Sequence, residues 1–301
     1  MGAISPIPQS TDRATLGEVI EKARRLLEQV GIESAGQESL WIMEHVLRLP
    51  AHHVLIDSDR LLSPAELVAA RGLIRRRIGR EPLQYILGTQ EFYGLEFHVN
   101  QAVLIPRPES ELLVEYVVQR IPAERQATIV DVCTGSGCIA VAIARQRPRA
   151  QMIATDRSKP SLDVARQNAV RHEVCERITW FEGDLLRPLA AKGLEGRIDV
   201  IVSNPPYIAE AEWATLQPEV QLFEPRDALV AGPRGTELHE RLLQEAGRYL
   251  SRGGALIMEI GAGQAHAIRR IVEQIQGYRL HRLVHDEAGL ERVVIVERVE
   301  T

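Results

Sequence analysis

The feature of this sequence that most limits its fold is an alternation of segment types that begins at residue 127. Short runs of apolar and β-branched residues, each typical of a buried strand, are separated by stretches long enough to form helices. Strands that alternate with helices build a mostly parallel sheet with helices on both faces. The expected strands are residues 127–133, 151–155, 178–183, 198–203 and 255–260, and residues 292–297 are expected to add an antiparallel strand at or near the edge.

The part of the chain before this alternation predicts a small helical domain. Thr15 with Glu18 and Ser63 with Glu66 form capping boxes, in which a hydroxyl residue and a glutamate three positions later satisfy free N–H groups at the start of a helix. Residues 90–99 alternate apolar and polar side chains, which predicts a β-hairpin. The expected domains are a helical domain at residues 11–88, a hairpin linker at 89–108 and an α/β domain at 109–301.

Composition and charge argue against several classes of function. The chain carries 36 Lys and Arg against 41 Asp and Glu, a net charge of −5, whereas proteins that grip nucleic acid through its phosphates usually carry a basic excess. No apolar run approaches the roughly 18 residues that would cross a membrane. The three cysteines form no C-x-x-C pair and the nine histidines show no ligand spacing. We therefore expect a cytoplasmic protein with no metal site and no direct contact with nucleic acid or membrane.

The turn after the first expected strand is the first candidate binding site. In an open parallel sheet, ligands lie beyond the carboxyl ends of the strands. Glycines at two of the turn positions let the backbone bend sharply and approach a ligand closely. The spacing differs from the G-x-G-x-x-G of dinucleotide sites, although Ala140 could take the place of the third glycine, and it suits no phosphate-binding P-loop. A tight turn that binds nothing is the alternative for these residues, which are Cys133, Thr134, Gly135, Ser136 and Gly137.

Two acidic residues extend this site. Asp156 ends the second expected strand, where a carboxylate can accept hydrogen bonds from both hydroxyls of a ribose; the alternative is a cap for a helix near residues 158–161. Asp184, next to Leu185, ends the third strand, where it could accept from the amino group of an adenine; the alternative is a solvated loop acid. Glycines and acids at three strand ends favour an adenosine ligand with a small second part, which fits S-adenosylmethionine better than a dinucleotide.

The fourth expected strand is followed by the most informative stretch of the chain, Asn204, Pro205, Pro206 and Tyr207. An amide or aryl-amine NH2 is a poor nucleophile because its lone pair is delocalised. Two acceptors for its hydrogens, the side-chain oxygen of Asn204 and the carbonyl of Pro205, would direct its electron density toward an electrophile. The prolines stiffen the turn, and Tyr207 offers a flat face for a planar group. The alternative is a rigid proline loop that only closes the end of the sheet.

Several motifs together give this chain a family resemblance. Residues 204–207 read Asn-Pro-Pro-Tyr, which adenine-N6 DNA methyltransferases and glutamine-N5 protein methyltransferases share. Residues 82–88, 92–94, 105–111 and 223–229 resemble the peptide chain release factor glutamine methyltransferases, the HemK/PrmC family, and the resemblance extends over nearly the whole chain from about residue 15. It implies a Rossmann-like class I methyltransferase domain, with a seven-stranded, mostly parallel α/β sheet, preceded by a small N-terminal helical domain.

The resemblance also implies an activity. A methyl group would pass from S-adenosylmethionine, without a metal, to the side-chain amide nitrogen of the glutamine in the Gly-Gly-Gln motif of class I peptide chain release factors. The helical domain would orient that partner. The residues implied for catalysis are Asn204, Pro205, Pro206 and Tyr207. Those implied for the cofactor are Cys133, Thr134, Gly135, Ser136, Gly137, Asp156, Asp184, Leu185 and Asn204. The chain departs from the family at Cys133, where many members have glycine, and at Ser110, where threonine is usual.

Other interpretations stay open at this point. A DNA methyltransferase would carry a target-recognition region and a basic face, and the chain has neither a large insertion after Tyr207 nor a positive net charge. A non-catalytic sensor of S-adenosylmethionine would not need Asn204 beside an acceptor-rich turn. Residues 261–264 indicate a turn and a helix start rather than a second ligand loop. A solvated face, or else a surface for an acidic partner, is expected at Arg71, Arg75, Arg76, Arg77 and Arg80.

Overall fold

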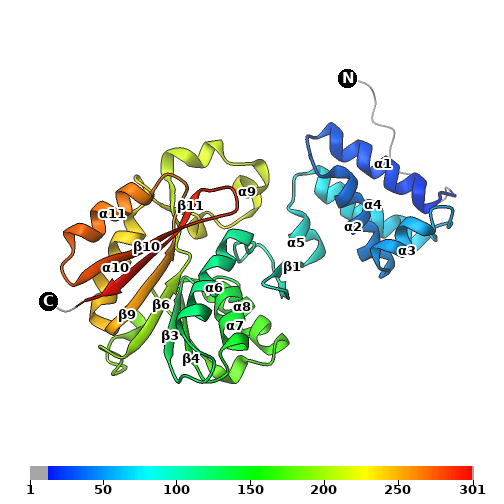
Figure 1. Cartoon of the computed structure of the whole chain (residues 1–301). Helices are drawn as coiled ribbons and strands as arrows, with labels where there is room; N and C mark the ends of the chain where they lie inside the picture. The colour runs from blue at the N-terminus through cyan, green and yellow to red at the C-terminus, as the bar shows by residue number, and fades with distance from the viewer. Residues whose placement is uncertain (1–12, 300–301) are drawn as a thin grey trace. The chain divides into compact units, whose positions relative to one another are not determined.

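The computed structural model describes residues 13–299, so residues 11 and 12 of the expected helical domain lie outside the described residues. By its contacts the chain divides into two compact units. The first, the helical unit, comprises the described residues up to Gly88 together with Pro218–Phe223. The second, the sheet unit, comprises Thr89–Gln217 and the described residues from Glu224 onward. Figure 1 shows the helices of the first unit and the sheet of the second.

The helical unit begins at an expected helix start. The Thr15 hydroxyl accepts a hydrogen bond from the Glu18 N–H at 3.3 Å, and the Glu18 carboxylate accepts from the Thr15 N–H at 2.8 Å. Ser63 and Glu66 form the second capping box in the same way. Apolar faces of the longer helices pack together as the core of this unit. Its helices are α1 (Leu16–Gln29), α2 (Ala35–Leu47), α3 (Ala51–Ile56), α4 (Pro64–Ile78), α5 (Leu83–Leu87) and α9 (Pro218–Phe223).

A seven-stranded sheet organises the sheet unit, in the order β10-β11-β9-β6-β3-β4-β5. Parallel pairing joins the neighbours β9, β6, β3, β4 and β5, and β11 pairs antiparallel with both β9 and β10. The expected Rossmann-like, seven-stranded, mostly parallel sheet is therefore confirmed. Residues 292–297 lie near the edge rather than at it, because β10 forms the edge. The strands are β3 (Thr128–Val132), β4 (Gln151–Asp156), β5 (Ile178–Glu182), β6 (Ile198–Ser203), β9 (Leu250–Glu259), β10 (Tyr278–His285) and β11 (Glu291–Arg298).

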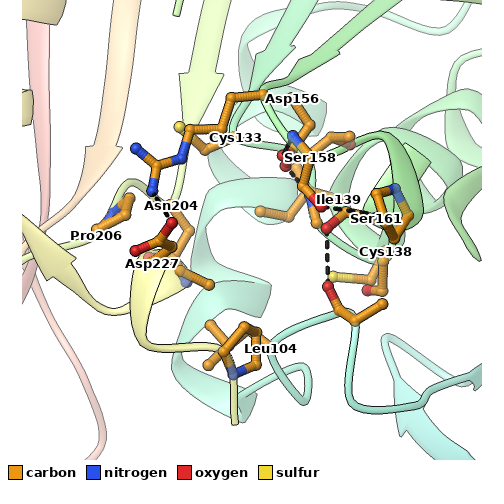
Figure 2. Close-up of a pocket in the computed structure, with 18 of the residues that line it drawn as sticks. Leu104, Cys133, Cys138, Ile139, Asp156, Ser158, Ser161, Asn204, Pro206 and Asp227 are labelled. Carbon is orange, nitrogen blue, oxygen red and sulfur yellow. Dashed lines mark hydrogen bonds and ion pairs between the residues drawn. The ribbon is translucent and has the colours of Figure 1, made fainter. Parts of the chain in front are cut away.

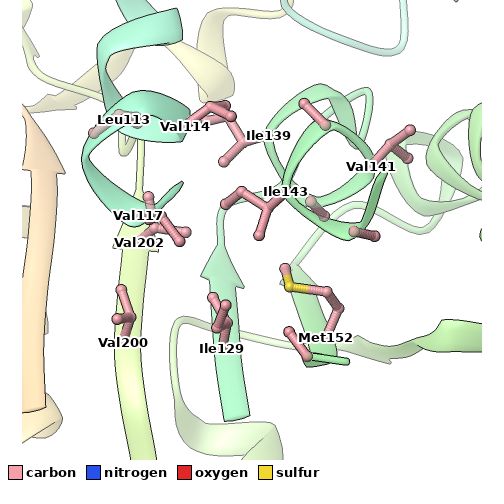
Figure 3. Close-up of a cluster of buried hydrophobic side chains, with 14 of the residues drawn as sticks. Leu113, Val114, Val117, Ile129, Ile139, Val141, Ile143, Met152, Val200 and Val202 are labelled. Carbon is pink, nitrogen blue, oxygen red and sulfur yellow. The ribbon is translucent and has the colours of Figure 1, made fainter. Parts of the chain in front are cut away.

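Two apolar cores, one on each face of the sheet, hold its helices in place. Successive residues of a strand point to opposite faces, so Ile129 joins one core and Val130 the other. Figure 3 shows the first core, where valines and isoleucines of the strands meet those of two helices. Each fully buried Val, Leu or Ile contributes about 1.5–3 kcal/mol. The helices are α6 (Glu111–Arg120), α7 (Cys138–Gln146) and α8 (Lys159–Arg171) on the first face, and α10 (Glu237–Tyr249) and α11 (Ala265–Gln274) on the second.

The expected hairpin is formed by β1 (Thr89–Phe92) and β2 (Leu95–His98). Asn168 of α8, which is fully buried, ties it to the rest of the sheet unit. The Asn168 side chain accepts from the His98 N–H at 2.7 Å and donates to the carbonyls of His98 and Ser136 at 3.0 and 2.9 Å. One side chain therefore connects the hairpin to the turn that follows β3.

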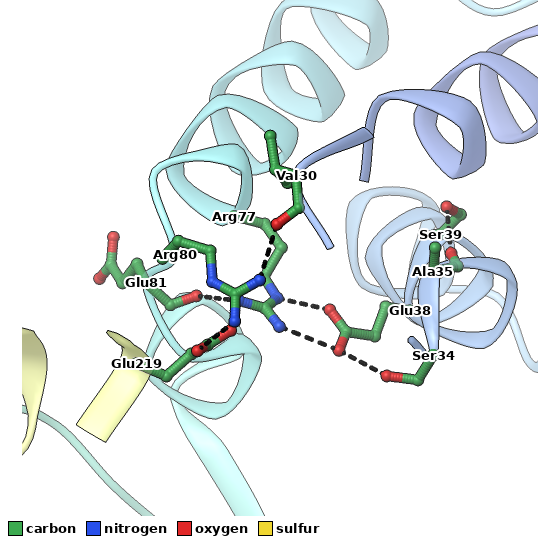
Figure 4. A network of polar contacts seen from close by, with 9 residues as sticks. All are labelled: Val30, Ser34, Ala35, Glu38, Ser39, Arg77, Arg80, Glu81 and Glu219. Atoms are coloured by element: carbon green, nitrogen blue, oxygen red, sulfur yellow. Dashed lines mark hydrogen bonds and ion pairs between the residues drawn. The ribbon is translucent and has the colours of Figure 1, made fainter. Parts of the chain in front are cut away.

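The arginine cluster of α4 is not simply a solvated face. The Arg77 side chain is only 7% exposed and pairs with Glu38 at 2.5 Å and Glu219 at 2.9 Å. Arg80 pairs with the same Glu219 at 2.6 Å and donates to the carbonyl of Val30 at 2.8 Å, as Figure 4 shows. The expectation of a solvated face is therefore wrong for Arg77, because folding brings to it two acids that lie far away in the sequence.

Arg77→Ala is expected to lower the free energy of unfolding by about 3–5 kcal/mol, because it leaves the buried carboxylate of Glu38 without its cation. Arg75 is exposed on the same helix, so Arg75→Ala is the matched control and is expected to cost less than about 0.5 kcal/mol. Urea denaturation of the parent and both variants measures the difference. Equal losses in the two variants would contradict the importance of the buried pair.

Candidate functional site

A cavity of about 770 Å³ opens where β3, β4, β5 and β6 end, and the turns that follow these strands line it (Figure 2). The link after the hairpin and residues 225–228 line it as well. Of the expected site residues, those that line the cavity are Cys133, Thr134, Gly135, Ser136, Asp156, Asp184, Leu185, Asn204 and Pro206. Gly137, Pro205 and Tyr207 are not among its lining residues. The structure thus brings most of the expected residues to one place, while their roles toward a ligand stay predictions.

The two glycines of the turn after β3 are needed for different reasons. Both have positive φ angles, 55° at Gly135 and 79° at Gly137, which glycine adopts at low cost. A Cβ at Gly137 would lie 2.9 Å from the Cβ of Ala165, so close packing of α8 excludes a side chain there. A Cβ at Gly135 would meet nothing within 4 Å. Gly135 therefore leaves open space in the cavity wall, whereas Gly137 allows two helices to pack closely.

Cys133 adopts a left-handed backbone conformation with a φ angle of 61°. This conformation costs a residue that has a Cβ about 1–2 kcal/mol. Glycine at this position would not bear this cost. Burial also raises the pKa of the Cys133 thiol above its usual range, so the thiol stays protonated at neutral pH and is a poor nucleophile.

Asp156 connects the cavity to the turn after β3. One oxygen of its carboxylate accepts from the Gly135 N–H at 2.9 Å, and the other accepts from the Ser158 N–H at 2.8 Å. Ser158 caps α8, so Asp156 supports the start of that helix as well as the turn. Burial raises the pKa of Asp156, although the backbone N–H groups oppose this shift. The Arg157 N–H also donates to this carboxylate, whose lone pairs still leave acceptor capacity for a ribose.

Asp184 is paired with two arginines, although its side chain is still 36% exposed in the loop after β5. Its Oδ2 accepts from Arg241 of α10 at 2.6 Å and lies 3.4 Å from the Arg187 guanidinium. Both cations approach the same oxygen, which leaves Oδ1 as the acceptor for a ligand. Leu185 beside it is buried, and its carbonyl accepts from the Thr155 hydroxyl at 3.0 Å.

Glu224 fastens two cavity-lining segments together. Its side chain is 2% exposed, accepts from the Ile105 N–H at 3.2 Å and pairs with Arg107 at 2.5 Å. Arg107 lines the cavity on one segment, and Arg226 lines it on the other. Both segments contain motifs that resemble the family, but the sequence gives no sign that Glu224 joins them. The contact joins the two segments into one wall of the cavity.

Asn204 begins a chain of hydrogen bonds that passes through Ser110, which also lines the cavity, to the buried Glu259. Its Nδ2 donates to the Ser110 hydroxyl at 2.9 Å, and that hydroxyl donates to Oε2 of Glu259 at 2.5 Å. Ser110 and Glu259 are 2% and 1% exposed. Because the amide NH2 is engaged on this side, Oδ1 is the atom left as an acceptor for a substrate in the cavity.

Sequence reasoning missed Ser110 and Glu259 as parts of the site. Ser110 was noted only as a departure from threonine, and Glu259 was hidden within an expected apolar strand. A signal was present in the sequence, because Glu259 lies in an expected buried strand and a buried carboxylate needs a hydrogen-bond donor. The partner itself could not be named, since Ser110 and Glu259 are far apart along the chain.

Tyr207 is held at both of its ends. Its hydroxyl hydrogen-bonds to the Glu259 carboxylate, and its carbonyl accepts from Nε2 of Gln264 at 2.7 Å. Oε1 of Gln264 accepts from the Gly261 N–H at 2.9 Å, which confirms residues 261–264 as the turn that leads into α11. A flat face of Tyr207 toward a substrate stays a prediction.

Comparisons with known proteins place this chain among related sequences. Residues 18–88 match the family described as PrmC N-terminal domain, and residues 108–223 match the methyltransferase small domain. The chain is 42% identical to a protein named release factor glutamine methyltransferase from Geobacter sulfurreducens, over 93% of this chain and 95% of that protein. Proteins of the same name from Chlorobaculum tepidum and Nitratidesulfovibrio vulgaris are 44% and 37% identical, over 77% and 97% of this chain and 80% and 98% of theirs.

Residues 13–299 include no helix that is long and apolar enough to cross a membrane. The same residues include no group of three or more His, Cys, Asp and Glu side chains arranged to hold a metal ion.

Cys133→Gly is expected to raise the free energy of unfolding by about 1 kcal/mol relative to Cys133→Ala, because only glycine removes the cost of the left-handed backbone. The alanine variant is the matched control, since it removes the thiol but keeps the Cβ. Chemical denaturation of the two variants measures the difference. A glycine variant less stable than the alanine variant would contradict this account of the turn.

Proposed function

The chain belongs to the family of release factor glutamine methyltransferases, and we propose that it methylates the glutamine of the Gly-Gly-Gln motif in class I peptide chain release factors. A methyl group passes from S-adenosylmethionine to the side-chain amide nitrogen, N5, and the products are N5-methylglutamine and S-adenosylhomocysteine. The protein then acts in translation termination, in the cytoplasm. The observation that carries this proposal is Asn204, whose amide is tied on one side so that its oxygen is left to accept from a substrate amide in the cavity.

The cavity suits S-adenosylmethionine in size and in the chemistry of its walls. Its volume of about 770 Å³ is within the range of small-molecule sites. The open position at Gly135 allows a ligand to approach the backbone, the free lone pairs of Asp156 fit ribose hydroxyls, and Oδ1 of Asp184 fits an adenine amino group. These assignments fit a methyl donor whose reacting end points toward Asn204.

The residues after β6 orient the substrate amide. Oδ1 of Asn204 and the carbonyl of Pro205 accept its two N–H groups, so that the nitrogen lone pair faces the methyl carbon. The N–C bond forms as the C–S bond breaks, and the electron pair of that bond stays on sulfur. The amide proton becomes acidic only as the new bond forms, so no strong base is required beforehand. Pre-orientation of this kind supplies up to roughly 7–11 kcal/mol of barrier lowering.

The helical unit orients the release factor in this proposal. The helical unit is compact, has its own core and contributes none of the residues that line the cavity, which fits a role in binding rather than in chemistry. The net charge of −5 fits a protein partner better than direct contact with nucleic acid.

The proposed reaction is tested by incubation with labelled S-adenosylmethionine and a release factor, followed by mass mapping of the methylated residue. Asn204→Ala is expected to lower kcat about 100- to 1000-fold, the usual loss for one preorganised polar contact at a reacting group. Its affinity for S-adenosylmethionine is expected to stay close to that of the parent. Label on a residue other than the glutamine, or normal turnover in Asn204→Ala, would overturn the proposal.

Asp156→Ala is expected to weaken the binding of S-adenosylmethionine at least about tenfold, because it removes two charge-assisted hydrogen bonds to the ligand. Asp163→Ala is the matched control, since Asp163 is an exposed acid on α8 that pairs with Lys159 and does not line the cavity. Isothermal titration calorimetry measures both affinities. Unchanged affinity in Asp156→Ala would refute the ribose assignment.

A further inference from the structure

Glu259 sits beneath the residues that hold the substrate amide. It is the last residue of β9, 1% exposed, and its carboxylate accepts from the Ser110 hydroxyl at 2.5 Å. The hydroxyl of Tyr207 hydrogen-bonds to the same carboxylate. Glu259 itself is not among the residues that line the cavity. One buried acid is therefore linked to both ends of the turn that begins with Asn204.

We propose that Glu259, acting through Ser110, is a positioning residue whose ionised form sets the direction in which the Asn204 amide faces. The inference rests on the proposed function, because it concerns the residue that holds the substrate amide. It adds a proton-dependent control that the role of Asn204 alone does not contain.

The direction of the hydrogen bonds follows from which atoms carry protons. An ionised carboxylate has no proton to donate, so Ser110 must donate its single hydroxyl hydrogen to Glu259. Only lone pairs of the Ser110 oxygen then remain for Asn204, and a lone pair binds an N–H rather than a carbonyl. The amide therefore turns its NH2 toward Ser110, as the 2.9 Å contact from Nδ2 shows. Its Oδ1 is left for the substrate.

Protonation of Glu259 removes this constraint. A neutral carboxyl group can donate its own proton to the Ser110 oxygen, and the Ser110 hydroxyl hydrogen is then free to turn toward Asn204. The Asn204 amide can now bind Ser110 through Oδ1 and present its NH2 to the cavity. Two N–H groups would then face the N–H groups of the substrate amide, and the turn would repel the substrate that it normally holds.

The surroundings of Glu259 make this proton exchange relevant near neutral pH. Burial, with a smaller contribution from the nearby Glu109, raises the pKa of Glu259 to about 7. Arg292 of β11 and the two hydroxyl donors act in the opposite direction. Nε2 of His239 of α10 donates to the backbone carbonyl of Glu259 at 2.7 Å, and burial lowers the pKa of His239 to about 4, so this residue is neutral in the same pH range. The folded protein therefore ionises Glu259 only as the pH rises through about 7.

The first arm of the test is a pH profile of kcat for methylation of a release factor. In the parent enzyme kcat is expected to fall about tenfold for each pH unit below the pKa of Glu259. In Glu259→Gln, which cannot ionise, kcat is expected to be lower and to lose this acidic limb. Calorimetric titration with S-adenosylmethionine at each pH separates this effect from titration of the buried acid Asp131, whose pKa is also raised to about 7 by burial.

The second arm uses two replacements of Ser110 that have nearly the same shape. Ser110→Thr keeps the hydroxyl, whereas Ser110→Val replaces it with a methyl group. The valine variant is expected to lose at least tenfold in kcat, with KM for the release factor and affinity for S-adenosylmethionine changed less than about twofold. The threonine variant is expected to retain parental kcat and the parental pH profile. This pair decides the matter even where Glu259→Gln does not fold.

The outcomes separate the inference from the proposed function. A parent enzyme that methylates no release factor at any pH refutes the proposed function. A parent enzyme that does so while Glu259→Gln keeps the same acidic limb refutes the role of Glu259. Equal kcat in Ser110→Thr and Ser110→Val refutes the hydrogen-bond chain.

Discussion

Parallel pairing of neighbouring strands is the constraint on which the rest of this structure depends. Val132 of β3 lies opposite Thr155 of β4 and Ser203 of β6. The residues that follow these three are Cys133, Asp156 and Asn204. Three expected site residues therefore lie side by side at the carboxyl ends of the parallel strands. If neighbouring strands were antiparallel, these residues would lie at opposite ends of the strands. The chemistry of the cavity is therefore a consequence of strand direction and register.

Buried acids then fix the turns that the sheet only brings near one another. Asp156 accepts from the backbone of the turn after β3, Glu224 joins two wall segments, and Glu259 reaches Asn204 through Ser110. A buried carboxylate is costly unless donors satisfy it. Each of these acids therefore holds its donors in defined positions, and the donors belong to the segments that line the cavity.

In the helical unit, buried ion pairs likewise join segments that are far apart in the sequence. Arg77 is buried between Glu38 of α2 and Glu219 of α9. Residues 218–223 come shortly after Asn204 and Tyr207 in the chain, yet by their contacts they belong with the helices of the first unit. The chain thus passes between the two units at residues 88–89, 217–218 and 223–224. The ion pairs of Glu219 with Arg77 and Arg80 hold residues 218–223 in the helical unit.

The sequence by itself determined the class of the fold, the capped helix starts at Thr15 and Ser63, and the turns at residues 133–137 and 204–207 that follow two of the strands. These features depend on local patterns, such as alternating apolarity, proline and glycine, which act within a few residues. It did not reveal β10, α3 or α5, which are short or partly exposed and have weak periodicity. It also did not reveal the partners of Arg77, Glu224 and Glu259. Only the tertiary structure decided these pairs, because a charged side chain pairs with whichever partner the fold brings near it. The spacing of residues along the chain does not tell which residues are close in space.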